Sequence, residues 1–208
     1  MSGVEPESSV QGVIGRVLNL LLHPDETWTA IEGEPATIEG LYRGWVLPLA
    51  AIAPVCRVIS LLAFGGIPMI GIHYHPGFVS VIGDAIGTYA LTLIAVYVLA
   101  LLTDQLSLQF GGERSLTQAF KLMAYCGTAA WVSGVFLLLP SIGGLFTLLG
   151  SLYSLYLLYL GLPRLMRSNP NLTLNYFGLI LLAAVVMAVI IGSLTHRVLH
   201  YGGPVWID

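Results

Sequence analysis

Two charged residues, Arg57 and Asp84, lie inside long apolar stretches of the sequence. Arg57 comes seven residues before Phe64, where its stretch ends, and Asp84 comes six residues after Phe78, where the next one begins. If the two stretches are antiparallel helices that cross a membrane, a rise of about 1.5 Å per residue places the charges about 10 and 9 Å below the same surface. A lone charge at that depth costs several kcal/mol. We therefore expect Arg57 and Asp84 to pair, directly or through water.

Two interpretations of this intramembrane charge pair remain open. The first is an ion or proton site in a polar cavity, because charges inside membrane spans often mark the path of a transported ion. The second is a static salt bridge that holds the two helices in register. A proton path usually contains more polar steps than one acid and one base, which favours the static salt bridge.

Four histidines form a candidate metal site on the side of the membrane opposite the N-terminus. His196 and His200 are four residues apart, so one face of a helix can present both side chains. His73 and His75 lie in an earlier loop and would supply the remaining ligands of a zinc or copper ion. The alternative is four unrelated histidines at the membrane interface, which is favoured because the sequence does not bring the two segments into contact.

The sequence contains no phosphate-binding loop, no Gly-x-Ser-x-Gly, no His-Glu-x-x-His and no pair of carboxylates at catalytic spacing. Its two cysteines, Cys56 and Cys126, lie in apolar runs and are too few for a disulfide framework or a metal cluster. A formal net charge of −3 without a basic patch argues against nucleic-acid binding. We therefore predict a protein without enzymatic activity and without a cofactor.

The composition indicates that lipid surrounds most of the chain. Of its 208 residues, 56% are hydrophobic and 9% are charged. A soluble domain has about 25% charged residues, so this chain has too little charge to cover a surface exposed to water. Five apolar runs have about the 20 residues that an α-helix needs to cross the hydrocarbon core of a bilayer. They are Trp45–Phe64, Phe78–Thr103, Ala119–Leu139, Leu145–Leu162 and Leu174–Thr195.

The predicted fold is therefore all-α, a polytopic membrane protein with a bundle of five transmembrane helices. Ahead of the bundle, Ser9–Leu22 has apolar residues at helical spacing but is too short to span, so we expect an amphipathic cytoplasmic helix on the membrane surface or against the bundle. Thr37 is the expected N-cap of the segment that leads into the first span, and Pro48 and Pro54 predict a kink in that span. The chain divides into an N-terminal segment (1–44), a five-span domain (45–195) and a short outer tail (196–208).

Small residues recur at helical spacing on three of the predicted spans. Such residues let two helix backbones approach closely inside a membrane. We expect these faces to pack against other helices, within one chain or between chains. They comprise Gly83 and Gly87 on the second span, Gly143, Thr147 and Ser151 at the fourth, and Ala184, Ala188 and Gly192 on the fifth.

Basic residues predict the orientation of the five spans. Five crossings place the termini on opposite sides, and the loops after the second and fourth spans, the first expected over Asp104–Thr117, lie on the N-terminal side. Basic residues favour the cytoplasmic side, and Arg197 alone falls on the opposite one. We therefore expect a cytoplasmic N-terminus and a periplasmic or extracellular C-terminus. The basic residues on the N-terminal side are Arg16, Arg43, Arg114, Lys121, Arg164 and Arg167.

A series of short motifs runs from the N-terminal helix to the end of the fourth span. They are Leu22–Glu32 (LHPDETWTAIE), Leu41-Tyr42, Pro48-Leu49-Ala50, Ala119-Phe120-Lys121, Ala124-Tyr125, Pro140, Gly143-Gly144 and Tyr153–Pro163 (YSLYLLYLGLP). In this order and spacing they resemble the bacterial branch of the Yip1 family of five-span membrane proteins.

The resemblance implies a multi-pass protein of the bacterial inner (plasma) membrane that is not an enzyme. It would bind a partner or organise the membrane, its partners being the lipid bilayer and a membrane protein or a second copy of the chain. Eukaryotic members of the family bind small prenylated GTPases and carry an Asp-Leu-Tyr-Gly-Pro motif; this sequence lacks the motif, so that role is not carried over. The alternative function is a small channel or transporter that uses Arg57 and Asp84.

Overall fold

The computed structural model describes residues 10–64, 77–139 and 141–201, with side chains described from 12 to 195 within these ranges. In this part of the chain the regular secondary structure is helical, and five helical segments are long and apolar enough to cross a membrane. The five predicted spans are confirmed as helices, and the fold is all-α. The segments are Ile38–Phe64, Phe78–Phe110, Leu116–Leu138, Gly143–Met166 and Thr173–Thr195.

The first segment begins at Ile38 rather than at the expected Trp45. Thr37 caps it, since its side-chain oxygen accepts a hydrogen bond from the Gly40 N–H at 3.1 Å, as the sequence predicts. Pro48 has no N–H to donate to the carbonyl of Gly44, so the α-helical ladder is interrupted there. The segment is accordingly built from α3 (Ile38–Leu41), a π-helical turn η1 (Tyr42–Val46), α4 (Leu47–Ala50) and α5 (Ile52–Phe64).

The second segment is a single helix, α6 (Phe78–Ser107), followed by a 3-10 turn, η2 (Leu108–Phe110). The expectation of a loop from Asp104 is therefore wrong. The helix continues for another turn because Asp104 and Ser107 are buried on its inner face, where the Ser107 hydroxyl donates to the Asp104 carbonyl at 2.8 Å.

The third segment is broken into three pieces, and the last two segments are continuous. Gly127 separates the first two pieces, and a Cβ at this glycine would lie 2.8 Å from Cζ2 of Trp131. The absence of a side chain at residue 127 therefore makes room for the indole ring. The elements are α7 (Leu116–Cys126), α8 (Thr128–Ser133), a 3-10 turn η3 (Gly134–Leu138), α9 (Gly143–Met166) and α10 (Thr173–Tyr201).

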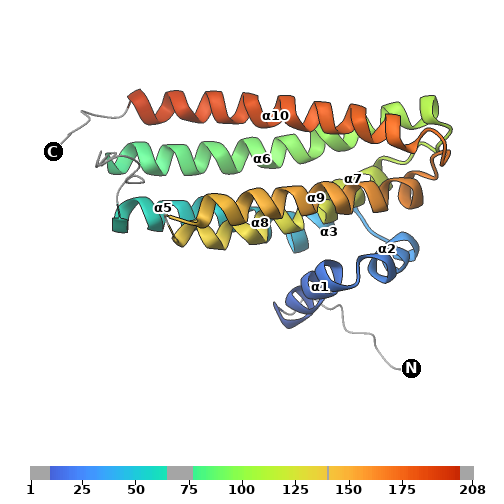
Figure 1. Cartoon of the computed structure of the whole chain (residues 1–208), viewed down its shortest axis with the longest axis horizontal. Coiled ribbons are helices and arrows are strands. Elements are labelled where there is room, and N and C mark those ends of the chain that lie inside the picture. The colour runs from blue at the N-terminus through green and yellow to red at the C-terminus, as the bar shows by residue number, and fades with distance from the viewer. Residues whose placement is uncertain (1–9, 65–76, 140, 202–208) are drawn as a thin grey trace.

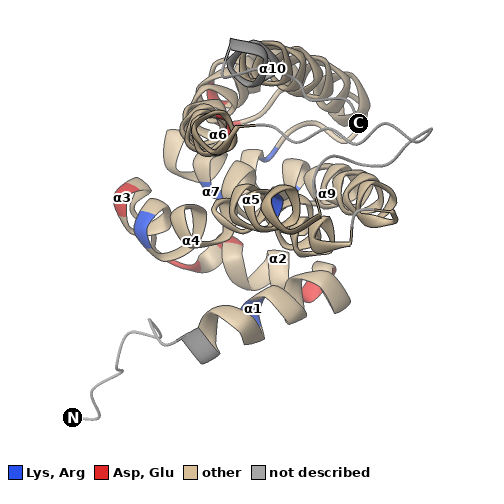
Figure 2. Ribbon diagram, turned by 90° about the vertical axis from the view of Figure 1, so that its left-hand side faces the viewer, with Lys and Arg blue, Asp and Glu red and all other residues tan. Residues whose placement is uncertain are grey.

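The long helices lie side by side, with α10 at the edge of the bundle (Figure 1). α7 packs against α6 and α9, whereas α10 packs chiefly against α6. In the most apolar stretch of the third segment 61% of the residues are buried, whereas in that of the last segment only 6% are. Viewed end-on, the ribbons of the long helices carry few charged residues (Figure 2). The outer surface of the bundle is therefore apolar, as contact with lipid requires.

Two short helices that precede the bundle, α1 (Val10–Leu22) and α2 (Pro24–Gly33), pack against its side (Figures 1 and 2). Trp28 of α2 is fully buried, and a Cβ at Gly161 of α9 would lie 2.8 Å from Cζ2 of its ring. The indole can approach α9 this closely because residue 161 has no side chain. Of the two placements expected for the amphipathic helix, the structure has the one against the bundle.

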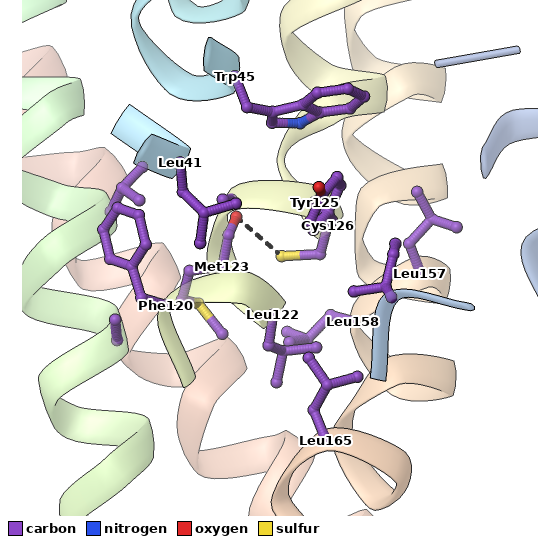
Figure 3. Close-up of a cluster of buried hydrophobic side chains, with 14 of the residues drawn as sticks. Leu41, Trp45, Phe120, Leu122, Met123, Tyr125, Cys126, Leu157, Leu158 and Leu165 are labelled. Atoms are coloured by element: carbon purple, nitrogen blue, oxygen red, sulfur yellow. Dashed lines mark hydrogen bonds between the residues drawn. The ribbon is translucent and has the colours of Figure 1, made fainter. Parts of the chain in front are cut away.

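The central core joins the first span to the third span and to α9 (Figure 3). The Trp45 ring packs 4.8 Å from that of Tyr125, centroid to centroid, and its Nε1 donates to the Thr128 hydroxyl at 3.0 Å. Cys126 is buried beneath them, and Cys56 is also buried and free. Both cysteines thus behave as small apolar side chains.

Candidate functional site

The charge pair that the sequence predicts is present between α5 and α6. Nε of Arg57 lies 3.6 Å from Oδ2 of Asp84, so the two side chains form an ion pair without a close hydrogen bond. The two partners differ in their surroundings, since the Asp84 side chain is 2% exposed and that of Arg57 is 45% exposed. The carboxylate is therefore the buried partner, and the guanidinium lies at the edge of the site.

Two hydroxyls accompany Asp84 on one face of α6. Ser80 and Thr88 lie four residues before and after it, a spacing that places all three side chains on the same side of a helix. Oδ1 of Asp84, Oγ of Ser80 and Oγ1 of Thr88 are all buried and have no hydrogen-bond partner among the described residues. Buried polar atoms in proteins are almost always hydrogen-bonded, so this row of oxygens has unused bonding capacity.

The row of oxygens and Arg57 suit two kinds of chemistry. Hydroxyls and a carboxylate can bond to water molecules in a chain along the helix, and such a chain can carry protons. The positive charge of Arg57 next to Oδ2 opposes the binding of a metal cation at the same carboxylate. The pair alone, without water, can also act as a static contact that keeps α5 and α6 in register.

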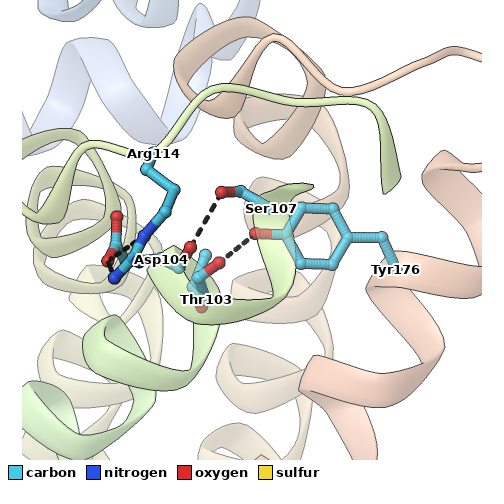
Figure 4. Close-up of polar contacts among 5 residues, drawn as sticks. All are labelled: Thr103, Asp104, Ser107, Arg114 and Tyr176. Atoms are coloured by element: carbon cyan, nitrogen blue, oxygen red, sulfur yellow. Dashed lines mark hydrogen bonds and ion pairs between the residues drawn. The ribbon is translucent and has the colours of Figure 1, made fainter. Parts of the chain in front are cut away.

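A second polar cluster lies at the other end of α6, and sequence analysis missed it (Figure 4). Nη2 of Arg114 donates to Oδ2 of Asp104 at 2.9 Å, and its Nε donates to the same oxygen at 3.3 Å. Asp104 is 5% exposed. Tyr176 of α10, fully buried, donates its hydroxyl to the carbonyl of Thr103 and stacks on Phe110. This cluster joins α6, the following loop and α10.

The signal for this cluster was present in the sequence. Ala100, Thr103, Asp104 and Ser107 are small or polar residues with the spacing i, i+3, i+4, i+7, and all four are buried. This spacing is that of one face of a helix, so it indicated that the second span continues beyond Thr103.

Lys121 is a buried cation that holds α2 against the bundle. The sequence predicts that Lys121 is a charge on the cytoplasmic side, yet its side chain is buried in α7 and only 2% exposed. Its Nζ donates to the carbonyl of Ile31 at 3.0 Å and to that of Glu34. These carbonyls lie at the C-terminal end of α2, where a helix has unpaired acceptors and a partial negative charge.

The proposed metal ligands are described only in part. His73 and His75 lie outside the described residues, and His196 and His200 lie on the last turns of α10, where the side chains are not described. Among the residues that the structure does describe, no three His, Cys, Asp or Glu side chains gather as metal ligands. The metal site therefore stays a prediction.

The small residues singled out in the sequence divide into packed and open positions. A Cβ at Gly143 would lie 2.4 Å from the Phe136 carbonyl oxygen, and one at Gly87 would lie 4.0 Å from Thr195 of α10. These glycines thus face neighbouring elements. Gly83, Thr147 and Ala184 are half-buried, whereas Ser151, Ala188 and Gly192 are exposed.

A glycine that sequence analysis did not single out makes the closest approach on α9. A Cβ at Gly150 would lie 2.2 Å from the Ser133 hydroxyl, so α8 and α9 can meet there only because residue 150 is glycine. The sequence pattern of Gly143, Thr147 and Ser151 therefore identified a helix that packs closely against its neighbours. Of its three residues, only Gly143 makes one of the closest contacts.

The fold defines the class of this protein, a polytopic all-α membrane protein with five long apolar helical segments among the described residues. A family model described as Yip1 domain matches residues 18–192, and the chain belongs to the Yip1 family. The resemblance that the motifs indicated is thereby confirmed, and the match continues through most of the fifth span.

Two curated relatives carry the same name in two strains of Escherichia coli. The chain is 27% identical over 198 residues to "Inner membrane protein YohC" of strain K12, an alignment that covers 91% of this chain and 98% of the relative. The protein of that name in strain CFT073 (O6:H1) gives the same figures. No solved structure matches the chain.

Proposed function

We propose that this chain is a non-enzymatic membrane protein that binds a partner inside the bilayer, either another membrane protein or a second copy of itself. The observation that carries the proposal is the surface of α10. Only 6% of the residues in its most apolar stretch are buried within the chain, against 61% for the third segment. Apart from its contacts with α6 and α9, most of this span is open to lipid or to another helix.

One flank of α10 is suited to such a contact. Ala188 and Gly192 are exposed there, and a Cβ at Gly192 would have no atom of the described chain within 4 Å. Small residues allow close approach between helices, and the resulting van der Waals packing is one of the forces that hold spans together in lipid. The neighbouring Val185 and Val189 are 51% and 64% exposed and would pack against the same partner.

The test is the mass and composition of the protein after gentle solubilisation from its native membrane. We expect a defined complex with a second protein or a homo-oligomer. Gly192→Leu should dissociate the complex, since the added side chain separates the helices. Val186→Leu is the matched control, because Val186 is exposed on the same helix about 120° away at 100° per residue. A monomeric wild-type protein, or equal effects of the two variants, would contradict the proposal.

A second candidate function is a small channel or transporter that uses Arg57 and Asp84. It is supported by the buried oxygens of Ser80, Asp84 and Thr88, which have no partner among the described residues. Liposomes containing the purified protein should then conduct protons or small ions faster than empty liposomes. Asp84→Asn should abolish the flux, whereas Tyr159→Phe, a change on the exposed surface of α9, should leave it unchanged. Flux equal to that of empty liposomes would exclude this function.

A further inference from the structure

A large groove separates α1 from the beginning of the first span. Its volume is about 1110 Å³, and Tyr125 of α7 contributes to its lining. Gly40, Gly44 and Pro48 line the groove, and a Cβ at Gly44 would meet no described atom within 4 Å. The π-helical turn lies beside it. Its apolar walls include Val13, Ile14, Leu41, Pro48, Leu49 and Ile52.

Part of the groove has the length of one leaflet of a bilayer. Nine residues separate Arg43 from Ile52, which both line the groove, and this corresponds to about 14 Å of helix. The hydrocarbon core of a bilayer is about 30 Å thick, so one leaflet accounts for about 15 Å. With Arg43 at the membrane interface, just before the expected start of the first span, Ile52 would lie near the midplane.

The exposed face of α1, whose Ile14 lines the groove, is also apolar. Ile14, Leu18 and Leu22 follow one another along α1 at intervals of four residues and are 54%, 50% and 69% exposed. The opposite face of α1 holds the helix to the rest of the chain, since Arg16 pairs with Glu34 and lies 5.3 Å from the centre of the Tyr125 ring. An apolar stripe of this kind is stable when it lies in the interfacial part of the bilayer.

The rim of the groove carries charges of both signs. Arg43 and Glu34 both line the groove. Glu39 lies beside it and forms an exposed ion pair with Arg43, with Nη2 and Oε1 2.8 Å apart, and Glu34 pairs with Arg16. The guanidinium of Arg43 can bind a phosphate through its several N–H donors. The carboxylates of Glu39 and Glu34 can accept hydrogen bonds from an ammonium group.

We propose that this groove binds one phospholipid with a zwitterionic headgroup that contains a primary amine, such as phosphatidylethanolamine. One acyl chain lies along the apolar walls towards Ile52. The phosphate binds Arg43, and the amine donates to Glu39 or Glu34. The lipid fills the space between α1 and the first span and so forms part of the contact between the N-terminal helices and the bundle.

The experiment is native mass spectrometry of the purified full-length protein after removal of endogenous lipid. Phosphatidylethanolamine, phosphatidylcholine and phosphatidylglycerol are added separately to equal concentrations. We expect the wild-type chain to retain one phosphatidylethanolamine after adventitious lipid and detergent have been removed. Phosphatidylcholine should be retained less, because its quaternary amine has no N–H to donate.

Variants at Gly44 test the location of the site. A Cβ at this exposed glycine would have no described atom within 4 Å, so a larger side chain fits without a clash and occupies the groove. Gly44→Ala should reduce retention slightly and Gly44→Phe by about tenfold, which corresponds to about 1.4 kcal/mol. Gly178→Leu is the control, since Gly178 is equally open on α10 and far from the groove in the chain.

Variants at the rim test the headgroup. Arg43→Gln should weaken retention of all three lipids, whereas Glu39→Gln should remove the preference for phosphatidylethanolamine over phosphatidylglycerol. The proposal is overturned if the wild-type chain retains no lipid preferentially, or if Gly44→Phe and Gly178→Leu retain it equally. It is also overturned if a protein segment copurifies in the groove and added lipid does not displace it.

Discussion

Nζ of Lys121, inside the third span, donates a hydrogen bond to the backbone carbonyl of Ile31 at 3.0 Å. The same ammonium group also donates to the Glu34 carbonyl. A single side chain of the membrane domain thus binds the C-terminal end of α2. Arg164 of α9 pairs with Asp25 at 2.8 Å near the beginning of α2, and the Tyr153 hydroxyl donates to the Leu21 carbonyl at 2.7 Å. The N-terminal helices are therefore fixed to the bundle at several points.

Replacing Lys121 should loosen this attachment. In Lys121→Met the two carbonyls lose their donor while they remain beside a buried side chain, which costs about 1–3 kcal/mol. We expect faster amide hydrogen exchange in α2 and easier proteolysis between α2 and α3, with the spans unchanged. The control is Arg167→Gln, because Arg167 pairs with Glu113 on the exposed surface, where ion pairs contribute little. Unchanged exchange in α2 of Lys121→Met would contradict this role.

The charge pair should respond unequally to the loss of its two partners. Arg57→Met leaves a carboxylate that is 2% exposed without its counter-charge, and such losses cost about 3–5 kcal/mol. Asp84→Asn leaves a guanidinium that is 45% exposed, and a long side chain of this kind can reach a more polar region. Resistance to unfolding in mixed detergent micelles should fall more for Arg57→Met than for Asp84→Asn.

Restoration in the double variant tests the same pair. Arg57→Met combined with Asp84→Leu removes both charges, and it should recover most of the stability that Arg57→Met alone loses. Additive losses in the double variant, or a greater loss for Asp84→Asn than for Arg57→Met, would show that the two residues do not act as a pair.

The hydroxyl of Tyr176 should stabilise the contact between α6 and α10. In Tyr176→Phe the Thr103 carbonyl loses a buried donor, and we expect a loss of about 1 kcal/mol in the free energy of unfolding. Tyr159→Phe removes the same atom from a ring that is 43% exposed and should have almost no effect. Thermal unfolding of both variants in one detergent makes the comparison, and equal shifts would argue against a stabilising hydrogen bond.

Labelling should show that the N-terminal side of the bundle is cytoplasmic. Glu113, between α6 and α7, and Ser141, before α9, are exposed and lie at opposite ends of the third span. Single cysteines at these positions, in a chain without Cys56 and Cys126, are treated with a membrane-impermeant maleimide on intact cells. We expect Ser141→Cys to react and Glu113→Cys to react only after lysis. The reverse pattern would invert the predicted orientation.

Several features of the fold were predictable from local sequence. The five spans follow from the length and composition of each apolar run, because the thickness of a bilayer sets the number of residues that a helix needs. The cap at Thr37 and the interruption at Pro48 each depend on a few adjacent residues. The pairing of Arg57 with Asp84 was predictable because the two spans are consecutive and antiparallel, and helical rise then fixes the relative depth of their residues.

Other features depend on which helices lie next to one another, and the apolar pattern of a span does not determine its neighbours. Lys121 appeared to be a solvated cytoplasmic charge, yet it is 90 residues from Ile31 in sequence and in contact with it in space. Asp104 appeared to begin a loop, yet it is buried in α6 and accepts a hydrogen bond from Arg114.

By itself, the sequence determined the number of long apolar helices, the helical class and the relative positions of Arg57 and Asp84 along their helices, since these depend on distances along a single helix. Tertiary structure decided the attachment of α1 and α2, the burial of Lys121 and Asp104, and the groove beside Gly44. These features require side chains from segments far apart in the chain to meet, and only the packing of the whole bundle brings those segments together.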